Sequence, residues 1–203
     1  MDSLIEKSIS KGFSYKEYRN HVSELLEQGL STGATQSEDL THYSTLNEVR
    51  MNRLDKTIQV PQEIKDKLAH LKVPHTLLVI SEGWCGDAAQ LVPVINKMAE
   101  ESDKLDLKVV LRDENDQLMN EYLTNGARSI PKLVLVEKET GIARGSWGPR
   151  PHDAAKLITD YKAEHGVIDE TAKTELQKWY LHDKGHSTME EILLLLKNTD
   201  KVK

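Results

Sequence analysis

Three short apolar runs constrain the fold of this chain more than any other feature. They are built mainly from Leu, Val and Ile, and they span residues 75–80, 107–111 and 132–136. Near-continuous apolar segments of this kind are typical of strands buried on both faces of a sheet. A fourth strand is expected at 142–147, after the turn Glu139-Thr-Gly141. Helical patterns separate the first three runs, so the sequence predicts an α/β fold with a mixed central sheet flanked by helices.

The segments on both sides of this region are predicted to be helical. Ser14-Tyr15-Lys16-Glu17 and Ser187-Thr-Met-Glu190 both have the spacing of a capping box, which marks a helix start. Residues 57–60 are a candidate for one more short strand. We therefore divide the chain into a helical N-terminal extension (1–56), a central domain (57–165) and a helical C-terminal extension (166–203). Both extensions are expected to pack on the core; a dimer face is the alternative, and the oligomeric state is left open.

Charge and hydropathy exclude several classes of partner. The formal net charge is -6, which argues against nucleic acid and against an anionic membrane surface as binding partners. The longest apolar run, 192–196, is far too short to span a bilayer. The first residues lack the basic and apolar segments of a signal peptide, so a cytoplasmic location is expected. The single cysteine, Cys85, cannot form an internal disulfide.

That cysteine lies in the sequence Trp84-Cys85-Gly86-Asp87-Ala88, between a predicted buried strand and a predicted helix containing Pro93. A thiol exposed at a helix N-terminus meets the positive end of the helix dipole and free backbone N–H groups. Both favour thiolate, so we expect the pKa of Cys85 to lie below the free value of about 8.5. Gly86 allows a partner's backbone to approach, and Trp84 offers a flat apolar surface. The alternative is a small, buried, unreactive side chain.

Together with two further segments, this motif resembles the thioredoxin family. The second segment is Asn125-Gly-Ala-Arg-Ser-Ile-Pro131-Lys-Leu-Val-Leu-Val136, and the third is Gly148 after the last strand. The resemblance runs from about residue 58 to 164 and implies a thioredoxin-like fold. It also implies that the Ile130–Pro131 bond is cis, that the Ile130 backbone pairs with an extended peptide beside Cys85, and that Gly148 lines the binding groove.

This chain departs from the family at three positions. The family motif is Trp-Cys-Gly-Pro-Cys, whereas the sequence here is Cys-Gly-Asp-Ala, with Ala88 in place of the resolving cysteine. Val79 stands where the family keeps a buried aspartate that assists that second cysteine. The two losses agree, since a buried carboxylate without a use costs stability. Asp87 replaces the family's proline; its carboxylate either opposes the fall of the thiol pKa or simply stabilises the helix start.

Three functions are compatible with these residues. The first is one-cysteine thiol–disulfide exchange, in which Cys85 attacks a protein or peptide disulfide or a glutathione-type adduct and an external thiol releases it. No cofactor is expected, apart from a small-thiol adduct on Cys85. The second is a redox-inactive module that binds a peptide or protein in the groove formed by residues 84, 86–88, 130, 131 and 148. The third, least favoured, is an iron–sulfur carrier resembling monothiol glutaredoxins, whose motif ends in Phe-Ser.

The remaining polar residues are weaker candidates. His182 and His186 have a spacing that suggests metal ligands, but Gly185 interrupts the helix they would need, so no metal site is expected. Arg128 either orients an acidic partner or braces its loop. We expect Arg144, Arg150 and His152 to be solvated.

Overall fold

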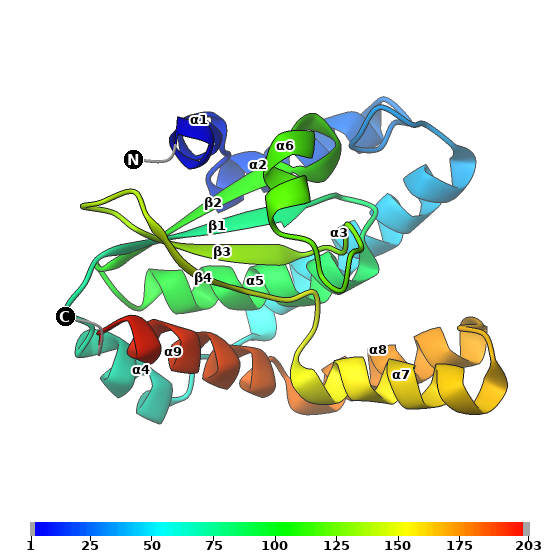
Figure 1. The fold of residues 1–203 in the computed structure, drawn as a ribbon. Helices are drawn as coiled ribbons and strands as arrows, with labels where there is room; N and C mark the ends of the chain where they lie inside the picture. The colour runs from blue at the N-terminus through cyan, green and yellow to red at the C-terminus, as the bar shows by residue number, and fades with distance from the viewer. Residues whose placement is uncertain (1–2, 201–203) are drawn as a thin grey trace.

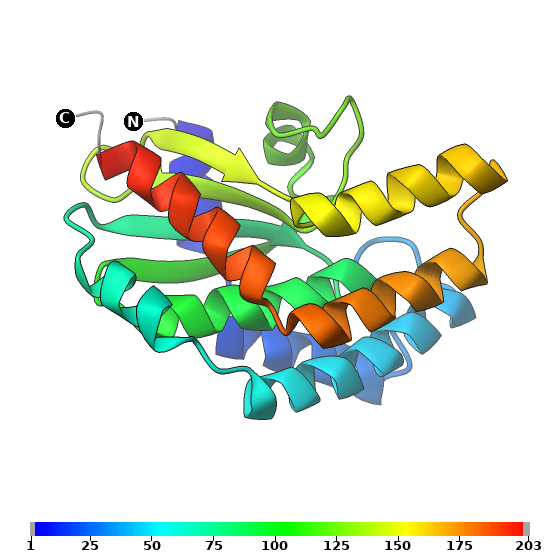
Figure 2. The ribbon, with the colours of Figure 1, turned by 90° about the horizontal axis from the view of Figure 1, so that it is seen from below.

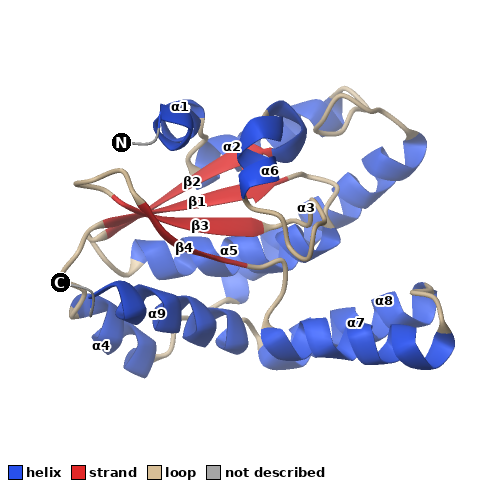
Figure 3. Cartoon of the chain, in the orientation of Figure 1, coloured by secondary structure: helices blue, strands red, loops and turns tan. Residues whose placement is uncertain are grey.

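A computed structural model describes residues 3–200, and Figures 1 and 3 show the arrangement of its elements. Within these residues, no helix has both the length and the apolar character needed to cross a membrane. In chain order the elements are α1 (Ser3–Lys11), α2 (Tyr15–Glu27), α3 (Glu38–Thr57), α4 (Gln62–Ala69), β1 (His75–Ser81), α5 (Gly86–Glu100), β2 (Leu105–Leu111), η1 (Arg112–Glu114), α6 (Asp116–Glu121), β3 (Lys132–Glu137), β4 (Ala143–Trp147), α7 (His152–His165), α8 (Glu170–Asp183) and α9 (His186–Asp200).

The strands form one mixed sheet in the order β2-β1-β3-β4. β1 is parallel to β2, with Leu77 opposite Leu107, and antiparallel to β3, with Leu77 opposite Leu135. β4 is antiparallel to β3. Figures 1 and 2 show α5 and α9 on one face of the sheet and α1 and α6 on the other. Every residue of β1 is buried as a result, and the α/β class predicted from the apolar runs is confirmed.

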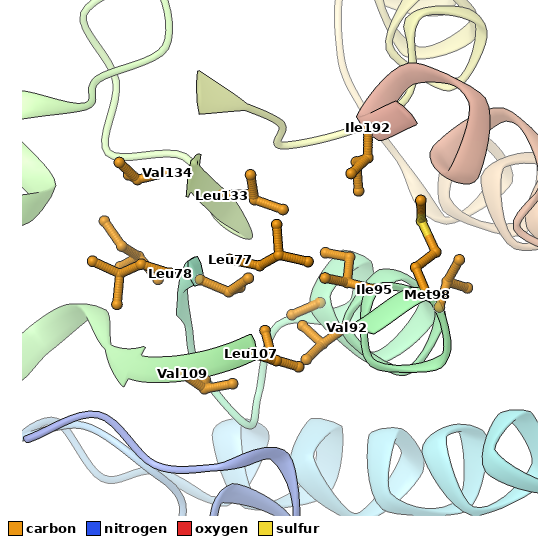
Figure 4. Close-up of a cluster of buried hydrophobic side chains, with 14 of the residues drawn as sticks. Leu77, Leu78, Val92, Ile95, Met98, Leu107, Val109, Leu133, Val134 and Ile192 are labelled. Atoms are coloured by element: carbon orange, nitrogen blue, oxygen red, sulfur yellow. The ribbon is translucent and has the colours of Figure 1, made fainter. Parts of the chain in front are cut away.

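The main core lies between the sheet and α5. Figure 4 shows Leu77 and Leu133 of the sheet directed towards Ile95 of α5, with Ile192 of α9 nearby. Each of these four side chains is fully buried. Because α5 packs so closely on β1 and β2, its first turn has a fixed place at the carboxyl end of β1. The residues that join β1 to α5 therefore lie at that end of the sheet.

The terminal helices contribute to this packing. Tyr18 of α2 and Met51 of α3 belong to the same buried cluster as the sheet. A second cluster joins Leu91 of α5 to α7 and α8, through Ile158 and Leu176. These two sets of contacts bring α3 and α8 to the N-terminal half of α5, where Cys85 lies.

Between α1 and α2, the chain also pairs with the outer edge of the sheet. The backbone N–H and C=O of Phe13 form two hydrogen bonds of 2.8 Å with Val109 of β2, in the antiparallel sense. The capping box at Ser14 is confirmed and follows immediately: the Ser14 hydroxyl accepts from the Glu17 N–H, and the Glu17 carboxylate accepts from the Ser14 N–H.

Two local predictions are wrong. Residues 57–60 form no strand, because α3 continues to Thr57 and the chain then passes directly to α4. The capping box at 187–190 does not form either, since α9 already begins at His186. The Ser187 N–H instead donates to the Asp183 carboxylate of α8, at 3.1 Å. A residue of the preceding helix thus accepts from the Ser187 N–H in place of Glu190, which the sequence pattern assigned as the acceptor.

Candidate functional site

Cys85 is the N-cap residue of α5 and lies next to the segment that precedes β3. Its Sγ accepts from the Ala88 N–H at 3.5 Å, and its thiol donates to the Ile130 carbonyl oxygen at 3.4 Å. The Ile130–Pro131 peptide bond is cis. The sulfur therefore lies between the start of a helix and a residue that precedes a cis-proline, although these segments are 45 positions apart in the sequence.

Our expectation of an exposed, acidic thiol is wrong. Only 8% of Cys85 is exposed, and the pKa of the thiol is raised to about 12. Burial is the largest cause, because it penalises the charged thiolate, and the negative charge of Asp87 raises the pKa further. The N–H groups at the start of α5 act in the opposite direction but are outweighed. At neutral pH this thiol is protonated, which is consistent with its donating to Ile130.

Asp87 is held in a polar cluster beside the sulfur. Its Oδ2 pairs with Nη2 of Arg150 at 2.6 Å, and its Oδ1 accepts from the hydroxyl of Tyr180 in α8 at 2.8 Å. The prediction that Arg150 is solvated is therefore wrong, since its guanidinium is committed to a side chain that is only 11% exposed. Burial and the neighbouring Asp87 raise the pKa of Tyr180, so its hydroxyl remains a donor. The C-terminal extension thus contributes directly to the surroundings of Cys85.

The loop before Cys85 is fixed by residues of the N-terminal extension. The Gly83 N–H donates to the Thr32 hydroxyl at 2.8 Å, and the Gly83 carbonyl accepts from Asn47 of α3 at 2.9 Å. Arg50 in turn donates to the Asn47 amide oxygen at 2.8 Å. Sequence reasoning missed Thr32, Asn47 and Tyr180, because they lie 36 to 93 positions from their partners and no local motif marks them.

The other predicted site residues gather around the same point. Trp84 is half-buried, and the guanidinium carbon of Arg112 lies 4.7 Å from the centre of its ring. Ala88 is 1% exposed. Gly148 has φ +107°, and a Cβ built on it would lie 2.4 Å from the Pro131 carbonyl oxygen. This close approach places Gly148 beside the cis-proline.

Two residues in the interior clarify which chemistry this site can perform. Val79 is fully buried in β1, paired with Val109 and Leu133. A carboxylate at that position would have apolar neighbours on both strands. With alanine at position 88 and one cysteine in the sequence, the chain offers no second thiol to Cys85. Any exchange chemistry at this site must use a thiol from outside the chain.

The described residues contain no group of three His, Cys, Asp or Glu side chains arranged to hold a metal ion. Nδ1 of His186, one of the two histidines considered as metal ligands, lies 3.6 Å from Oε2 of Glu190 in α9. Arg128, the loop residue, pairs with Asp116 of α6.

A mixed sheet whose first strand leads through a cysteine into a long helix, with a cis-proline facing that cysteine, defines a thioredoxin-like protein. Residues 33–162 match the family model described as thioredoxin. This is more than half of the chain, and the protein belongs to the thioredoxin family. The match begins inside the segment that we assigned to the N-terminal extension, so it includes α3.

Solved structures with a similar fold share little sequence with this chain. A protein of unknown function from Pseudomonas aeruginosa superposes with a TM-score of 0.65 at 12% identity, covering 96% of this chain and 97% of its own. An HIV epitope scaffold superposes with a TM-score of 0.63 at 14% identity, covering 95% and 97%. These likenesses extend over both terminal extensions and concern the fold alone. Comparison with curated proteins finds no match.

We expect Asp87→Asn to lower the pKa of the Cys85 thiol and to speed its alkylation at neutral pH by about tenfold. The substitution removes a negative charge that raises this pKa, and the amide still accepts from Tyr180. Arg150 would then face the sulfur without its acidic partner and would favour thiolate further. The measurement is the rate of reaction with iodoacetamide as a function of pH. Asp153→Asn, which removes an exposed carboxylate from α7, is the matched control; equal rates in both variants would contradict the role of Asp87.

Proposed function

We propose that this thioredoxin-family protein performs thiol–disulfide exchange through Cys85 alone. The observation that carries the proposal is the position of its sulfur, 3.4 Å from the carbonyl oxygen of the residue before a cis-proline and 3.5 Å from a helix N–H. An extended peptide that pairs with the Ile130 backbone would place a disulfide beside Sγ. In this proposal, the groove that binds the substrate peptide is formed by Trp84, Gly86, Asp87, Ala88, Ile130, Pro131 and Gly148.

The reaction needs two exchange steps and an external thiol. In the first, the Cys85 thiolate attacks one sulfur of a substrate disulfide, forming a mixed disulfide and releasing the other sulfur as a thiolate. In the second, an external thiolate attacks the mixed disulfide, forms a new disulfide with the substrate sulfur and returns Cys85 as thiolate. We propose protein or peptide disulfides as substrates and a glutathione-type small thiol as the releasing reagent. The proposal includes a cytoplasmic location, where such thiols are abundant.

The raised pKa of Cys85 sets the speed of the first step. Thiolate is the attacking species, and a thiol with a pKa of about 12 supplies little of it at neutral pH. We therefore propose slow exchange in the conformation described, with faster exchange when a partner displaces Asp87 or its cluster. This feature distinguishes the protein from a general disulfide reductant.

A second function is favoured by the same burial. A protonated thiol that donates to Ile130 can serve as a fixed part of a binding surface, and Ala88 and Val79 have lost the groups that complete a redox cycle. The protein would then bind a peptide or protein segment without redox chemistry. The two functions make opposite predictions for Cys85→Ser, which keeps a hydrogen-bond donor and removes the nucleophile.

The experiment that tests the proposal is adduct formation with glutathione disulfide, followed by mass spectrometry of the intact protein. We expect the folded wild type to gain one glutathione slowly, the adduct to disappear on addition of glutathione, and Cys85→Ser to gain none. The protein unfolded in urea is the control for a reactive cysteine. If the unfolded chain reacts to completion while the folded chain stays unmodified, exchange is ruled out and the binding function is supported.

A further inference from the structure

A groove between α3 and α8 is separate from the cysteine site. Figure 2 shows these two helices near one another beside α5, and the groove has a volume of about 370 Å³. Its lining includes Val49, Arg50 and Arg53 of α3, Gln90 of α5, and Gln177 and Leu181 of α8. None of the residues proposed for exchange lines it. Its volume lies within the range of small-molecule sites.

Positive charge is concentrated at one side of this groove. Among the side chains that the structure describes (residues 4–199), no carboxylate lies within 4 Å of the guanidinium of Arg50 or of Arg53, whereas Lys178 of α8 pairs with Glu175. Arg50 is half-buried, and burial together with the nearby Arg53 lowers its pKa. Arg53 is exposed, so the half-buried guanidinium of Arg50 carries the desolvation cost, and an anion bound beside both arginines would offset that cost and their mutual repulsion. The chain as a whole has a net charge of -6, so this groove differs in sign of charge from the average of the protein.

Apart from the ion-paired Lys178, the rest of the lining is apolar or neutral. Val49 is 65% exposed and Leu181 is 53% exposed, on facing helices. At the floor, Gln90 donates to Gln177 at 2.7 Å and links α5 to α8. A ligand that filled this space would need an anionic group for the arginines and an apolar body to cover Val49 and Leu181.

We propose that this groove binds a small organic carboxylate with an apolar body. A carboxylate matches the planar fork of a guanidinium. It carries a single charge and is therefore cheaper to desolvate beside apolar walls than a phosphate dianion. The two exposed apolar side chains would be covered by the body of the ligand. The site goes beyond the proposed exchange reaction and does not depend on the sulfur of Cys85.

The groove also has a connection to the cysteine loop. Nη1 of Arg50 lies 3.7 Å from the position of a Cβ built on Gly86, and it donates to Asn47, which in turn holds the Gly83 carbonyl. A bound carboxylate would compete with Asn47 for this guanidinium. Arg53 has no such link, so it is the residue to change in a test of binding.

Calorimetric titration with octanoate tests the proposal. We expect saturable binding by the wild type and by Cys85→Ser, an affinity at least tenfold lower for Arg53→Gln, and an unchanged affinity for Lys162→Gln. The last variant removes one exposed positive charge outside the groove. Val49→Asp, at an exposed position, adds a repelling charge to the apolar wall and should also abolish binding. Amide shifts by NMR at Val49, Thr174 and Leu181 would locate the ligand.

Octyl phosphate and inorganic phosphate define the outcomes that overturn the proposal. Tighter binding of octyl phosphate than of octanoate would reject the carboxylate assignment. Inorganic phosphate bound as tightly as octanoate would reject the role of the apolar wall. Absence of saturable octanoate binding, or equal affinity in wild type and Arg53→Gln, would reject the site itself. Because Cys85→Ser cannot perform exchange, octanoate binding by this variant separates a failure of the groove from a failure of the proposed exchange function.

Discussion

Replacing Gly148 by alanine is expected to destabilise the protein by about 3 kcal/mol or more. Gly148 has φ +107°, a conformation that residues with a side chain rarely adopt, and the added Cβ would lie 2.4 Å from the Pro131 carbonyl oxygen. That oxygen belongs to the backbone at the start of β3, so it cannot move away without disturbing the sheet. Urea unfolding of the purified variant measures the effect.

Gly126→Ala is the matched control for this prediction. Gly126 also has a positive φ, +77°, but a Cβ built there has nothing within 4 Å. The control therefore carries only the conformational cost of a left-handed residue, about 1 kcal/mol. A loss for Gly148→Ala no larger than that for Gly126→Ala would show that the close approach to Pro131 is absent in solution.

The second large effect concerns stability at alkaline pH. The folded chain keeps the Cys85 proton up to a pKa of about 12, whereas the unfolded chain releases it above about 8.5. Between these values the unfolded state binds fewer protons, so the free energy of unfolding falls as pH rises. The expected slope from this one group is about 1.4 kcal/mol per pH unit.

Cys85→Ala removes this dependence and supplies the comparison. We expect the stabilities of the two proteins to converge, or to reverse in favour of the variant, as pH rises from about 8.5 towards 10. Groups remote from Cys85 that titrate in the same range contribute to both proteins and cancel in the difference. Urea midpoints measured for both proteins at stepped pH provide the data. Parallel stability curves would contradict a thiol that stays protonated through burial.

The strands of the sheet were predictable from local pattern. The apolar runs at 75–80, 107–111 and 132–136 and the turn at 139–141 correspond to β1, β2, β3 and the β3–β4 connection. The strand predicted at 57–60 does not form because α3 continues to Thr57, and this helix overrides the β-type composition of the segment. The pattern at 187–190 gave the wrong helix start because the Ser187 N–H donates to Asp183 of the preceding helix and α9 already begins at His186.

The surroundings of the cysteine were not predictable in the same way. The sequence placed Cys85 at a helix start, and the helix N–H groups do lower its pKa. Burial raises this pKa, and so does the negative charge of Asp87, whose position is fixed by Arg150 and Tyr180. Tyr180 lies 93 positions from Asp87. No motif near Cys85 reveals that a helix in the C-terminal extension reaches this point. The direction of the pKa shift of Cys85 could therefore not be predicted from the sequence.

The pairing of Phe13 with Val109 covers part of the open edge of the sheet with a segment from the N-terminal part of the chain. β2 is an outermost strand, and its exposed N–H and C=O groups would otherwise be a template onto which a strand of another copy could add. Phe13 fills that position from within the same chain. A shortened protein reduced to the family-matched residues would present an open border there, and self-association into oligomers or fibrils would be its characteristic failure.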